Sequence, residues 1–257
     1  MKAKKSFGQH FLTDEAIASR IAASLAQAKA VVHVLEVGPG KGVLTKYLAR
    51  QDINLRVVEA DKDMVNYLVK HRIVDESKII FLDFLKLSLA KVFDGKPFLI
   101  IGNYPYNISS QILIKMVNHR ELVPEMVGMF QKEVADRVIA PPGSKTYGVI
   151  SVLVQAYYRG ELLMDVAPDS FSPPPKVNSA VIRLTRKDNS VLGCDERLFR
   201  TVVKTAFGQR RKMLRNTLKA LVKDPEILAD PFFNQRPEQL SVAEFVDITK
   251  KLSQPET

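Results

Sequence analysis

The chain has 257 residues, of which 46% are hydrophobic and 26% charged, and its formal net charge at pH 7 is +10. This composition is typical of a soluble globular protein with a substantial core. No apolar run approaches the ~20 residues of a membrane-spanning helix, and the basic start MKAKKSFGQHFL has no apolar stretch or cleavage site of a secretory signal. We therefore expect no membrane partner.

The excess of positive charge predicts a polyanionic partner, and nucleic acid is favoured over an anionic membrane surface. The single cysteine, Cys194, excludes an internal disulfide and fits a reducing, cytoplasmic location. It lies in a Gly-Cys-Asp turn with no histidine near it in sequence, which favours a surface or half-buried thiol without a chemical role over a nucleophile. The histidines at 33, 71 and 119 are scattered and match no metal-ligand spacing, so we expect no metal site.

The first two-thirds of the chain alternate between apolar, β-branched runs and helical patterns. The expected strands cover residues 31–37, 54–59, 78–82, 98–102 and 126–130, and the expected helices cover 44–50, 62–71, 87–92, 109–118, 132–139 and 149–158. Two further strand-like runs, 161–166 and 180–185, flank a proline loop and could pair as an antiparallel edge. This alternation predicts an α/β fold with a parallel sheet covered on both faces.

The composition of the chain changes after Arg186. Residues 187–190 have the composition of a linker, and from Glu196 onward the pattern is helical. Prolines at positions 225, 231 and 237 divide that region into short helices. We therefore predict one domain over residues 1–186 and a second, helical domain over residues 187–257.

A glycine-rich turn follows the first expected strand, in the sequence VLEVGPGKGVL. Glycines at 38, 40 and 42 allow the backbone to turn tightly and to approach a ligand closely. A dinucleotide site usually has the spacing G-x-G-x-x-G, whereas the spacing here is G-x-G-x-G and Glu36 precedes it. This arrangement is typical of S-adenosylmethionine (SAM) sites, where the Glu36 carboxylate would suit the ammonium group of the cofactor.

Acidic residues end the next two expected strands. Glu59 lies 21 positions after Gly38, where a carboxylate can accept hydrogen bonds from both ribose hydroxyls, and Asp83 ends the third strand, where it would suit the adenine amino group. Either acid alone could be a solvated strand end. Together with the glycine turn they lie at three successive strand ends, where open α/β sheets bind ligands, and so predict a SAM pocket.

The fourth expected strand ends in Asn103-Tyr104-Pro105-Tyr106, next to that pocket. The exocyclic amine of adenine is a poor nucleophile because its lone pair is delocalised into the ring. The Asn103 side-chain oxygen and a backbone carbonyl held by Pro105 can accept hydrogen bonds from the amine and favour a tetrahedral nitrogen. Tyr106 offers a flat face on which an unstacked base can lie. The alternative is an aromatic turn that only caps the strand.

A basic segment lies in the helical C-terminal region. Between Asp195 and Lys223 there are nine Lys or Arg residues and two acids, including the run FGQRRK at positions 207–212. A basic helical face is often only solvated, but this imbalance favours phosphate contacts that give salt-sensitive affinity for RNA. Lys2, Lys4 and Lys5 are expected to add to the same attraction.

Together these motifs resemble the ribosomal RNA small-subunit adenine N6,N6-dimethyltransferases (the KsgA/RsmA family), and the resemblance covers nearly the whole chain. The matching motifs are residues 5–12, 36–42, Glu59, Asp83, 102–109, 130–133, 147–148, 171–179 and 207–212. It implies a doubly wound methyltransferase domain with a small helical C-terminal domain. It further implies SAM-dependent dimethylation of two adjacent adenines in a hairpin loop near the 3′ end of 16S rRNA, within the immature small ribosomal subunit, by a monomeric enzyme.

The resemblance also assigns site residues. The family's cofactor positions match His10, Leu12, Gly38, Glu59, Asp83 and Asn103. The catalytic and base-binding positions match Asn103, Pro105, Tyr106 and Phe171, with the Phe171 ring as the second wall of the adenine slot. Two residues depart from the family's common pattern, which often has Asn at position 10 and Leu at position 104. An imidazole nitrogen can replace an amide, so we expect SAM binding to survive.

Two other functions compete with this interpretation. One is the related macrolide-resistance methylase, which acts on large-subunit rRNA; the proline loop and residues 207–212 favour the small-subunit enzyme. The other is a non-catalytic RNA- or DNA-binding factor that kept the fold, against which the intact Glu59, Asp83 and Asn103 argue.

Overall fold

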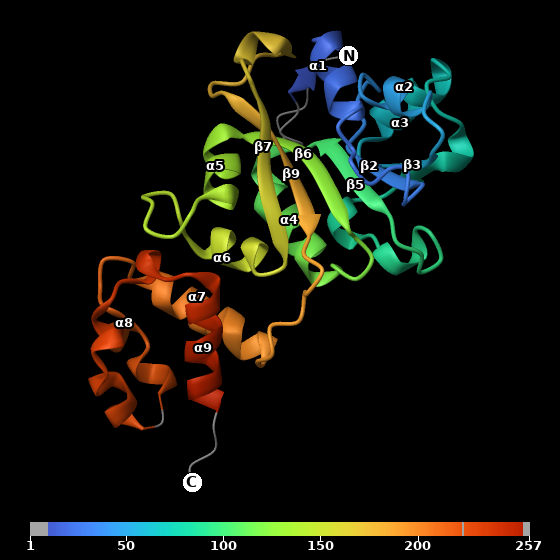
Figure 1. Ribbon diagram of the computed structural model, residues 1–257. Coiled ribbons are helices and arrows are strands. Elements are labelled where there is room, and N and C mark those ends of the chain that lie inside the picture. The colour runs from blue at the N-terminus through green and yellow to red at the C-terminus, as the bar shows by residue number, and fades with distance from the viewer. Residues whose placement is uncertain (1–9, 223, 254–257) are drawn as a thin grey trace. The chain divides into compact units, whose positions relative to one another are not determined.

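A computed structural model describes residues 10–222 and 224–253 of the protein (Figure 1). Lys2, Lys4, Lys5 and the first residues of the N-terminal motif therefore lie outside the described residues, as does Lys223. The described residues form two compact units. The first is built from the residues up to Ala135 together with Arg159–Arg186, and the second from Asp136–Tyr158 together with the residues from Lys187 onward.

The first unit is organised around a seven-stranded sheet with the strand order β4-β3-β2-β5-β6-β9-β7. The strands are β2 (His33–Val37), β3 (Asn54–Glu59), β4 (Ile79–Phe81), β5 (Leu99–Asn103), β6 (Glu125–Gln131), β7 (Tyr158–Val166) and β9 (Ser179–Arg186). The pairs from β4 through β6 are parallel, and β9 runs antiparallel to β6. The expected parallel α/β sheet is confirmed, and the two late strands lie together at one edge.

The strand order reverses direction between β2 and β5. From β2 the chain continues outward to β3 and β4, and it then returns to place β5 on the other side of β2. In open α/β sheets such a switch point leaves a crevice at the carboxyl ends of the strands, because the connections on either side lead away from it. Val37 and Asn103 end the two strands that flank this crevice.

Helices and 3-10 turns connect the strands. The helices of the first unit are α1 (Glu15–Ala22), α2 (Thr45–Leu48), α3 (Lys62–Lys70) and α4 (Ser109–Asn118), while α5 (Lys132–Ile139) continues into the second unit. Short 3-10 turns cover Glu76–Lys78, Phe84–Lys86, Leu89–Lys91, Tyr106–Ile108 and Pro168–Ser170. The segment 87–92 is thus a 3-10 turn and not the expected helix, and α2 is shorter than the expected 44–50.

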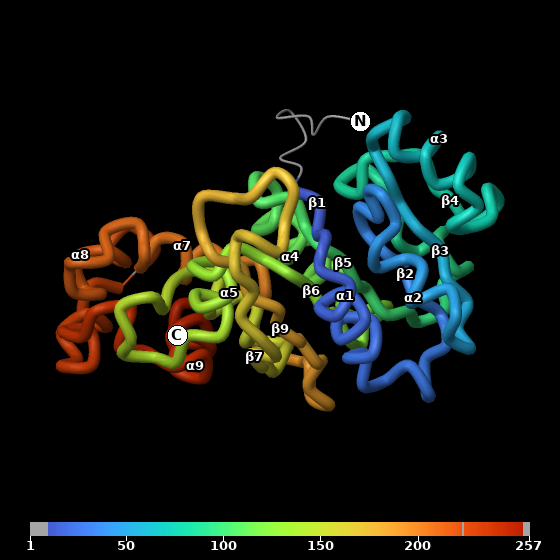
Figure 2. The backbone as a smooth tube through the Cα atoms, turned by 90° about the horizontal axis from the view of Figure 1, so that it is seen from above, coloured from blue at the N-terminus to red at the C-terminus, as the bar shows by residue number. Residues whose placement is uncertain are grey.

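Three N-terminal and loop elements were not expected from the sequence. Strand β1 (Phe11–Leu12) pairs antiparallel with β8 (Phe171–Ser172), with Phe11 opposite Ser172 and Leu12 opposite Phe171, and the two strands form a separate two-stranded ribbon. Helix α1 follows β1 and begins at a cap in which the Asp14 side chain accepts a hydrogen bond from Ile17 N at 3.0 Å. Figure 2 shows β1 and α1 beside β5 and β6.

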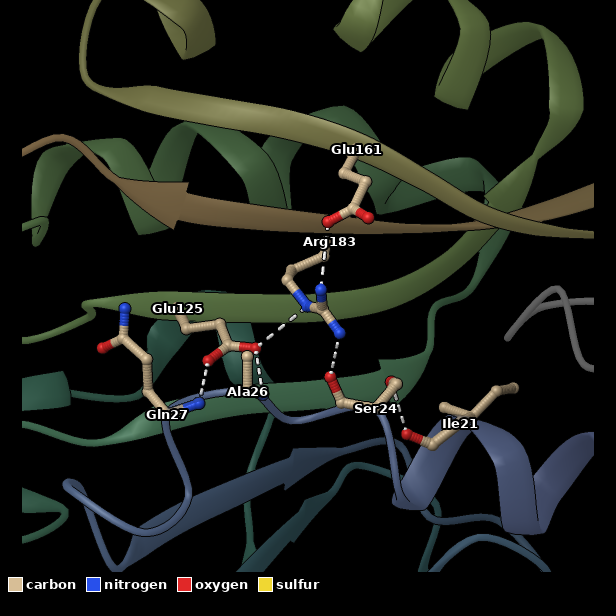
Figure 3. Close-up of polar contacts among 7 residues, drawn as sticks. All are labelled: Ile21, Ser24, Ala26, Gln27, Glu125, Glu161 and Arg183. Atoms are coloured by element: carbon tan, nitrogen blue, oxygen red, sulfur yellow. Dashed lines mark hydrogen bonds and ion pairs between the residues drawn. The ribbon is translucent and has the colours of Figure 1, made fainter.

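A buried ionic cluster fixes the end of α1 to the sheet (Figure 3). Glu125, at the start of β6, is fully buried, and its two carboxylate oxygens accept hydrogen bonds from Ala26 N at 2.9 Å and Gln27 N at 2.7 Å. Nε of Arg183 lies 3.4 Å from Glu125 Oε1 in an ion pair. The same guanidinium donates to Ser24 O at 2.6 Å and to Glu161 at 3.0 Å. The loop after α1 is therefore held by two strands at once.

The second unit is helical. Its helices are α6 (Val149–Gln155), α7 (Glu196–Gly208), α8 (Leu214–Thr217) and α9 (Val242–Ser253), joined by 3-10 turns at Lys219–Leu221, Pro225–Ala229, Pro231–Asn234 and Pro237–Gln239. Each of the three prolines singled out in the sequence opens one of these turns, because a missing N–H is tolerated at a helix start.

Residues 136–158, assigned to the first domain on sequence grounds, group with the C-terminal helices in the structure. The contacts show why. The Tyr147 and Phe207 rings meet edge to face at 6.1 Å between centroids, and Phe207 also packs on Phe245 at 5.9 Å. Gly143 N donates to Glu238 O at 2.6 Å. Tyr147 and Phe207, which are far apart in the sequence, thus pack together in the second unit.

Candidate active site

A cavity of about 630 Å³ lies at the carboxyl ends of β2, β3 and β5, at the switch point of the sheet. Of the site residues predicted from the sequence, the structure gathers eight in its wall: His10, Leu12, Gly38, Glu59, Asp83, Asn103, Pro105 and Tyr106. Phe171 is not among the lining residues. Its side chain is 4% exposed and packs in the hydrophobic core of the first unit.

The glycine turn after β2 forms the floor of the cavity. Gly38, Gly40 and Gly42 have φ angles of 69°, 55° and 77°, in the left-handed region that favours glycine. A Cβ on Gly42 would lie 2.6 Å from a methyl carbon of Ile73, so this glycine also allows close packing against the chain after α3. The turn therefore presents its backbone to the cavity.

The Glu59 carboxylate is tied to this turn. Its Oε2 accepts a hydrogen bond from Gly40 N at 3.1 Å, and its Oε1 accepts one from Asp61 N at 2.9 Å. Burial raises the pKa of Glu59, and the N–H groups of Asp61 and Gly40 oppose that rise. The two bonds fix the orientation of the carboxylate while each oxygen keeps a second lone pair for a ligand.

Glu36 is the most deeply buried acid in the wall of the cavity. It is 1% exposed, and its Oε2 has no hydrogen-bond partner among the described residues. Burial raises the pKa of Glu36 to about 8; the Thr45 hydroxyl opposes this rise and the negative charge of Glu59 adds to it. A buried carboxyl oxygen without a hydrogen-bond partner is costly. It therefore marks a position at which a cationic ligand group would be stabilised.

Asp83 follows β4 on the far side of the cavity. Its Oδ1 accepts a hydrogen bond from Leu85 N at 2.9 Å, which caps the 3-10 turn Phe84–Lys86. The turn continues the wall of the cavity, together with Phe81 and Leu82, which are 56% and 39% exposed. These two apolar residues were not predicted as site residues. Their position just before Asp83 in the sequence was the one feature that could have indicated a place in the site.

Asn103 ends β5, and its side chain is oriented by the N-terminal segment. Its Nδ2 donates a hydrogen bond to His10 O at 3.0 Å. Because the amide nitrogen makes this bond, the amide oxygen remains available as the acceptor that an amine ligand would need. His10 thus orients Asn103 through its backbone carbonyl, whatever the role of its imidazole ring.

Tyr104 belongs to the wall of the cavity, and its ring packs against the sheet. It is 1% exposed, its ring lies against Gly102 and Gly128, and its hydroxyl donates to Val127 O at 3.2 Å. A Cβ on Gly128 would come within 1.9 Å of the Tyr104 ring. The tyrosine that departs from the family's common leucine is therefore accommodated by glycines on two adjacent strands.

The His10 imidazole stacks on Tyr106, with 5.4 Å between ring centroids and 26° between the ring planes. Its Nδ1 lies 2.9 Å from Pro173 O, in the proline loop. The hydroxyl of Tyr106 is hydrogen-bonded to Ser179 Oγ at 2.6 Å. The ring expected to receive a base is thus fixed in place, and one of its faces is in contact with His10.

The cavity suits SAM on three grounds. Its volume is within the range of cofactor sites, ~300–1,000 Å³. The site does not suit a pyrophosphate, because the helix after the glycine turn, α2, has only four residues and the nearby carboxylates would repel the phosphate charge. The partnerless oxygen of Glu36 matches a ligand that carries an ammonium group.

Among the described residues no cluster of His, Cys, Asp or Glu could hold a metal ion, and none of the helices is both long and apolar enough to cross a membrane.

These features define a SAM-dependent methyltransferase of the doubly wound α/β class, and two solved structures share the fold. A dimethyladenosine transferase from Plasmodium falciparum is 24% identical with a TM-score of 0.78, and covers 94% of this chain and 97% of its own. The 23S rRNA methyltransferase ErmE is 22% identical with a TM-score of 0.71, and covers 95% and 100%.

The model of the ribosomal RNA adenine dimethylase family matches residues 1–254, and the chain belongs to this family. Among curated relatives, proteins named ribosomal RNA small subunit methyltransferase A are 54% identical in Parabacteroides distasonis (97% of this chain, 93% of the relative) and 53% identical in Flavobacterium johnsoniae (98% and 96%). The resemblance seen in the sequence is confirmed, and the protein is an rRNA adenine dimethylase that uses SAM.

Proposed function

We propose that the chain dimethylates N6 of two adjacent adenines in a hairpin loop near the 3′ end of 16S rRNA. The substrate would be the immature small ribosomal subunit in the cytoplasm, the enzyme a monomer, and the reaction a step of ribosome biogenesis. The names of the curated relatives support the small subunit as the target. The observation that carries the chemistry is the orientation of Asn103, whose amide nitrogen is bound to His10 O at 3.0 Å.

SAM, when bound, supplies an electrophilic methyl group on a positively charged sulfur. The residues of the chain then have to orient the adenine amine. Asn103 Oδ1 and the carbonyl of Tyr104, restricted by the following Pro105, accept the two amine hydrogens and favour a tetrahedral nitrogen. No strong base is needed, because the methylated amine is acidic and loses its proton to water. Orientation of the two reacting groups then supplies much of the rate.

The target adenine would stack on Tyr106. His10 touches that ring in the structure, so the base replaces His10 as the stacking partner or stacks on the ring's other face. The hydrogen bond to Ser179 holds the hydroxyl end of the Tyr106 side chain in place while the stacking partners change. We retain Phe171 as the proposed second wall; it is held in the core and joined to Leu12 through the ribbon of β1 and β8.

The cofactor roles follow from the wall of the cavity. We propose that Glu59 accepts hydrogen bonds from the ribose hydroxyls and that Asp83 accepts one from the adenine amino group. Gly38 allows the close approach of the methionine part, which Glu36 binds through its ammonium group. Leu12 contributes apolar surface, and His10 contributes the carbonyl that orients Asn103.

Cofactor binding should release close to one proton at pH 7. Glu36 has a pKa of about 8 and is therefore protonated below that pH in the free enzyme. The ammonium group of SAM keeps its protons and stabilises the charged Glu36 carboxylate, so Glu36 loses its proton to solvent when SAM binds. SAM affinity should accordingly rise from pH 6 toward pH 8. Titration calorimetry in two buffers of different ionisation enthalpy measures the released protons.

Glu36→Gln provides the control for this prediction, because the amide has nearly the same size and cannot ionise. It should bind SAM more weakly and release no proton. Proton release by Glu36→Gln equal to that of the natural protein would show that another group is the source.

The basic segment of the second unit is the proposed phosphate-binding surface. Arg210 is partly engaged within the unit, since it donates to Ser144 O at 3.2 Å and lies 3.9 Å from Glu238. Arg211 and Lys212 are exposed in the turn after α7. The basic run therefore lies in a turn and not on a helical face, with Arg211 and Lys212 open to solvent.

Arg211→Gln should weaken RNA binding at every sequence and reduce the slope of log K against log salt by about one. Fluorescence anisotropy with a small-subunit rRNA hairpin at several salt concentrations measures both quantities. Arg159→Gln, at an exposed arginine on β7 outside the basic segment, removes the same charge and should leave the salt slope unchanged. An unchanged salt slope for Arg211→Gln would exclude Arg211 from the interface.

Mapping of tritiated methyl groups tests the proposed function. The enzyme is incubated with labelled SAM and with small or large ribosomal subunits from a strain that lacks the modification. We expect label only in small-subunit rRNA, at two adjacent adenines and at up to two methyls each. Label in large-subunit rRNA would instead support the macrolide-resistance type of methylase, and saturable RNA binding without SAM binding would indicate a non-catalytic factor.

A further inference from the structure

Lys115 makes contacts that the chemistry described so far does not use. It lies in α4, the helix that follows the Asn103–Tyr106 segment, and its Nζ donates hydrogen bonds to Leu85 O at 2.9 Å and Leu87 O at 2.6 Å. The same ammonium lies 5.4 Å from the centroid of the Phe84 ring. Two backbone carbonyls and one ring of a single short loop therefore surround one lysine.

These contacts are unlike those of a surface lysine. The side chain is half-buried, and burial lowers the pKa of Lys115, while the negative charge of Asp83 opposes the fall. A lysine that only kept the protein soluble would leave its ammonium in water, where the ion is strongly hydrated. Bonds from a charged donor to carbonyl groups are stronger than those between neutral groups. The loop is thus held by a charge on a neighbouring helix.

Leu85 is bound by Lys115 and also orients the Asp83 side chain. Leu85 donates its N–H to Asp83 Oδ1 at 2.9 Å, and its carbonyl accepts from Lys115 at 2.9 Å. One peptide segment therefore connects the carboxylate proposed to bind adenine with the helix that begins behind Tyr106. Phe84 and Leu85 line the cavity directly.

We propose that Lys115 is a positioning residue for the cofactor: its ammonium group holds the loop Phe84–Leu87 so that Asp83 presents its carboxylate to the adenine of SAM. The inference rests on the proposed roles of Asp83 and of the cavity. It predicts that Lys115 acts on cofactor affinity and not on the methyl transfer step, since it does not reach the reacting atoms.

Lys115→Met tests this role, because methionine keeps the unbranched apolar stem but lacks the ammonium group, and with it the charge and the donors. The Kd for SAM, measured by calorimetry on the full chain, should rise by roughly tenfold, ~1.4 kcal/mol. The KM for SAM should rise in parallel, whereas kcat at saturating SAM should stay within about twofold. Lys115→Arg keeps donors and charge and should recover most of the affinity. Lys91→Met, at an exposed lysine in the next turn of the same loop region, should bind as the natural protein does.

A double-substitution cycle separates positioning from a general loss of structure. If Lys115 acts through Asp83, Lys115→Met should have little further effect on the Kd in an Asp83→Asn background, because interacting residues are not additive. Full additivity, unchanged affinity of Lys115→Met, or a fall in kcat at constant KM would each overturn the inference. Absence of SAM binding by the unsubstituted protein would overturn the proposed function itself, and this is measured first.

Discussion

Asn103→Ala should reduce methyl transfer by at least ~10²–10³-fold, the cost of removing one oriented hydrogen-bond group from a transition state, while RNA binding stays largely intact. In the proposed mechanism the amide oxygen is the acceptor that changes the geometry of the adenine amine, and alanine has no group to replace it. The substitution also removes the bond from Nδ2 to His10 O, so some loss of SAM affinity is expected. Single-turnover methylation at saturating SAM, together with RNA binding, separates these effects.

Two variants make this test specific. Asn118→Ala, at an exposed asparagine at the end of α4, should leave turnover unchanged. Asn103→Asp keeps an acceptor but places a carboxylate oxygen against the His10 carbonyl, so it should retain some activity and lose part of its orientation. Turnover by Asn103→Ala equal to that of the natural protein would refute the proposed role of this residue.

Glu125→Ala should lower the free energy of unfolding by ~3–5 kcal/mol, the usual cost of breaking a buried ion pair by removal of one partner. The change leaves the N–H groups of Ala26 and Gln27 without their acceptor and leaves the Arg183 guanidinium without its buried counter-charge. Urea unfolding followed by circular dichroism gives the free energy. SAM affinity should fall as well, because the same cluster holds the loop after α1, and α1 contributes Ile21 to the wall of the cavity.

The Lys46–Glu15 ion pair is a suitable comparison for this cluster. Both side chains are largely exposed, at 38% and 51%, and exposed pairs contribute at most ~1 kcal/mol. Lys46→Ala should therefore change stability little. A loss for Glu125→Ala no greater than that for Lys46→Ala would show that the buried cluster does not stabilise the fold.

The sequence was most informative about the parallel strands and their ends. Apolar runs such as residues 98–102 are buried on both sides of a sheet, so their pattern is local and strong. The polar residue that follows each parallel strand lies at the edge of the sheet where the carboxyl ends of the strands meet, and this position does not depend on how the side chains pack. Glu59, Asp83 and Asn103 could be assigned to one cavity on this basis alone, and the cavity contains all three.

Features that depend on distant partners were not predictable in the same way. A two-residue strand such as Phe11–Leu12 has no pattern of its own and exists only because Phe171–Ser172 lies opposite. Lys115 has no sequence signal, since its partners are carbonyl groups 28 and 30 residues away. The grouping of residues 136–158 with the C-terminal helices depends on aromatic contacts that a composition change near Arg186 does not reveal.

The small ribbon of β1 and β8 has a consequence for the order of events on the enzyme. Leu12 belongs to the wall that surrounds the donor, and its pairing partner Phe171 begins the segment that leads to the proline loop. Thr13 extends the connection, since its N–H and its hydroxyl both donate to Ser170 O, at 2.8 and 3.0 Å. If Leu12 and Phe171 have their proposed roles, SAM bound against β1 would also fix the position of β8, because backbone hydrogen bonds join the two strands. We therefore expect SAM to bind before the nucleotide.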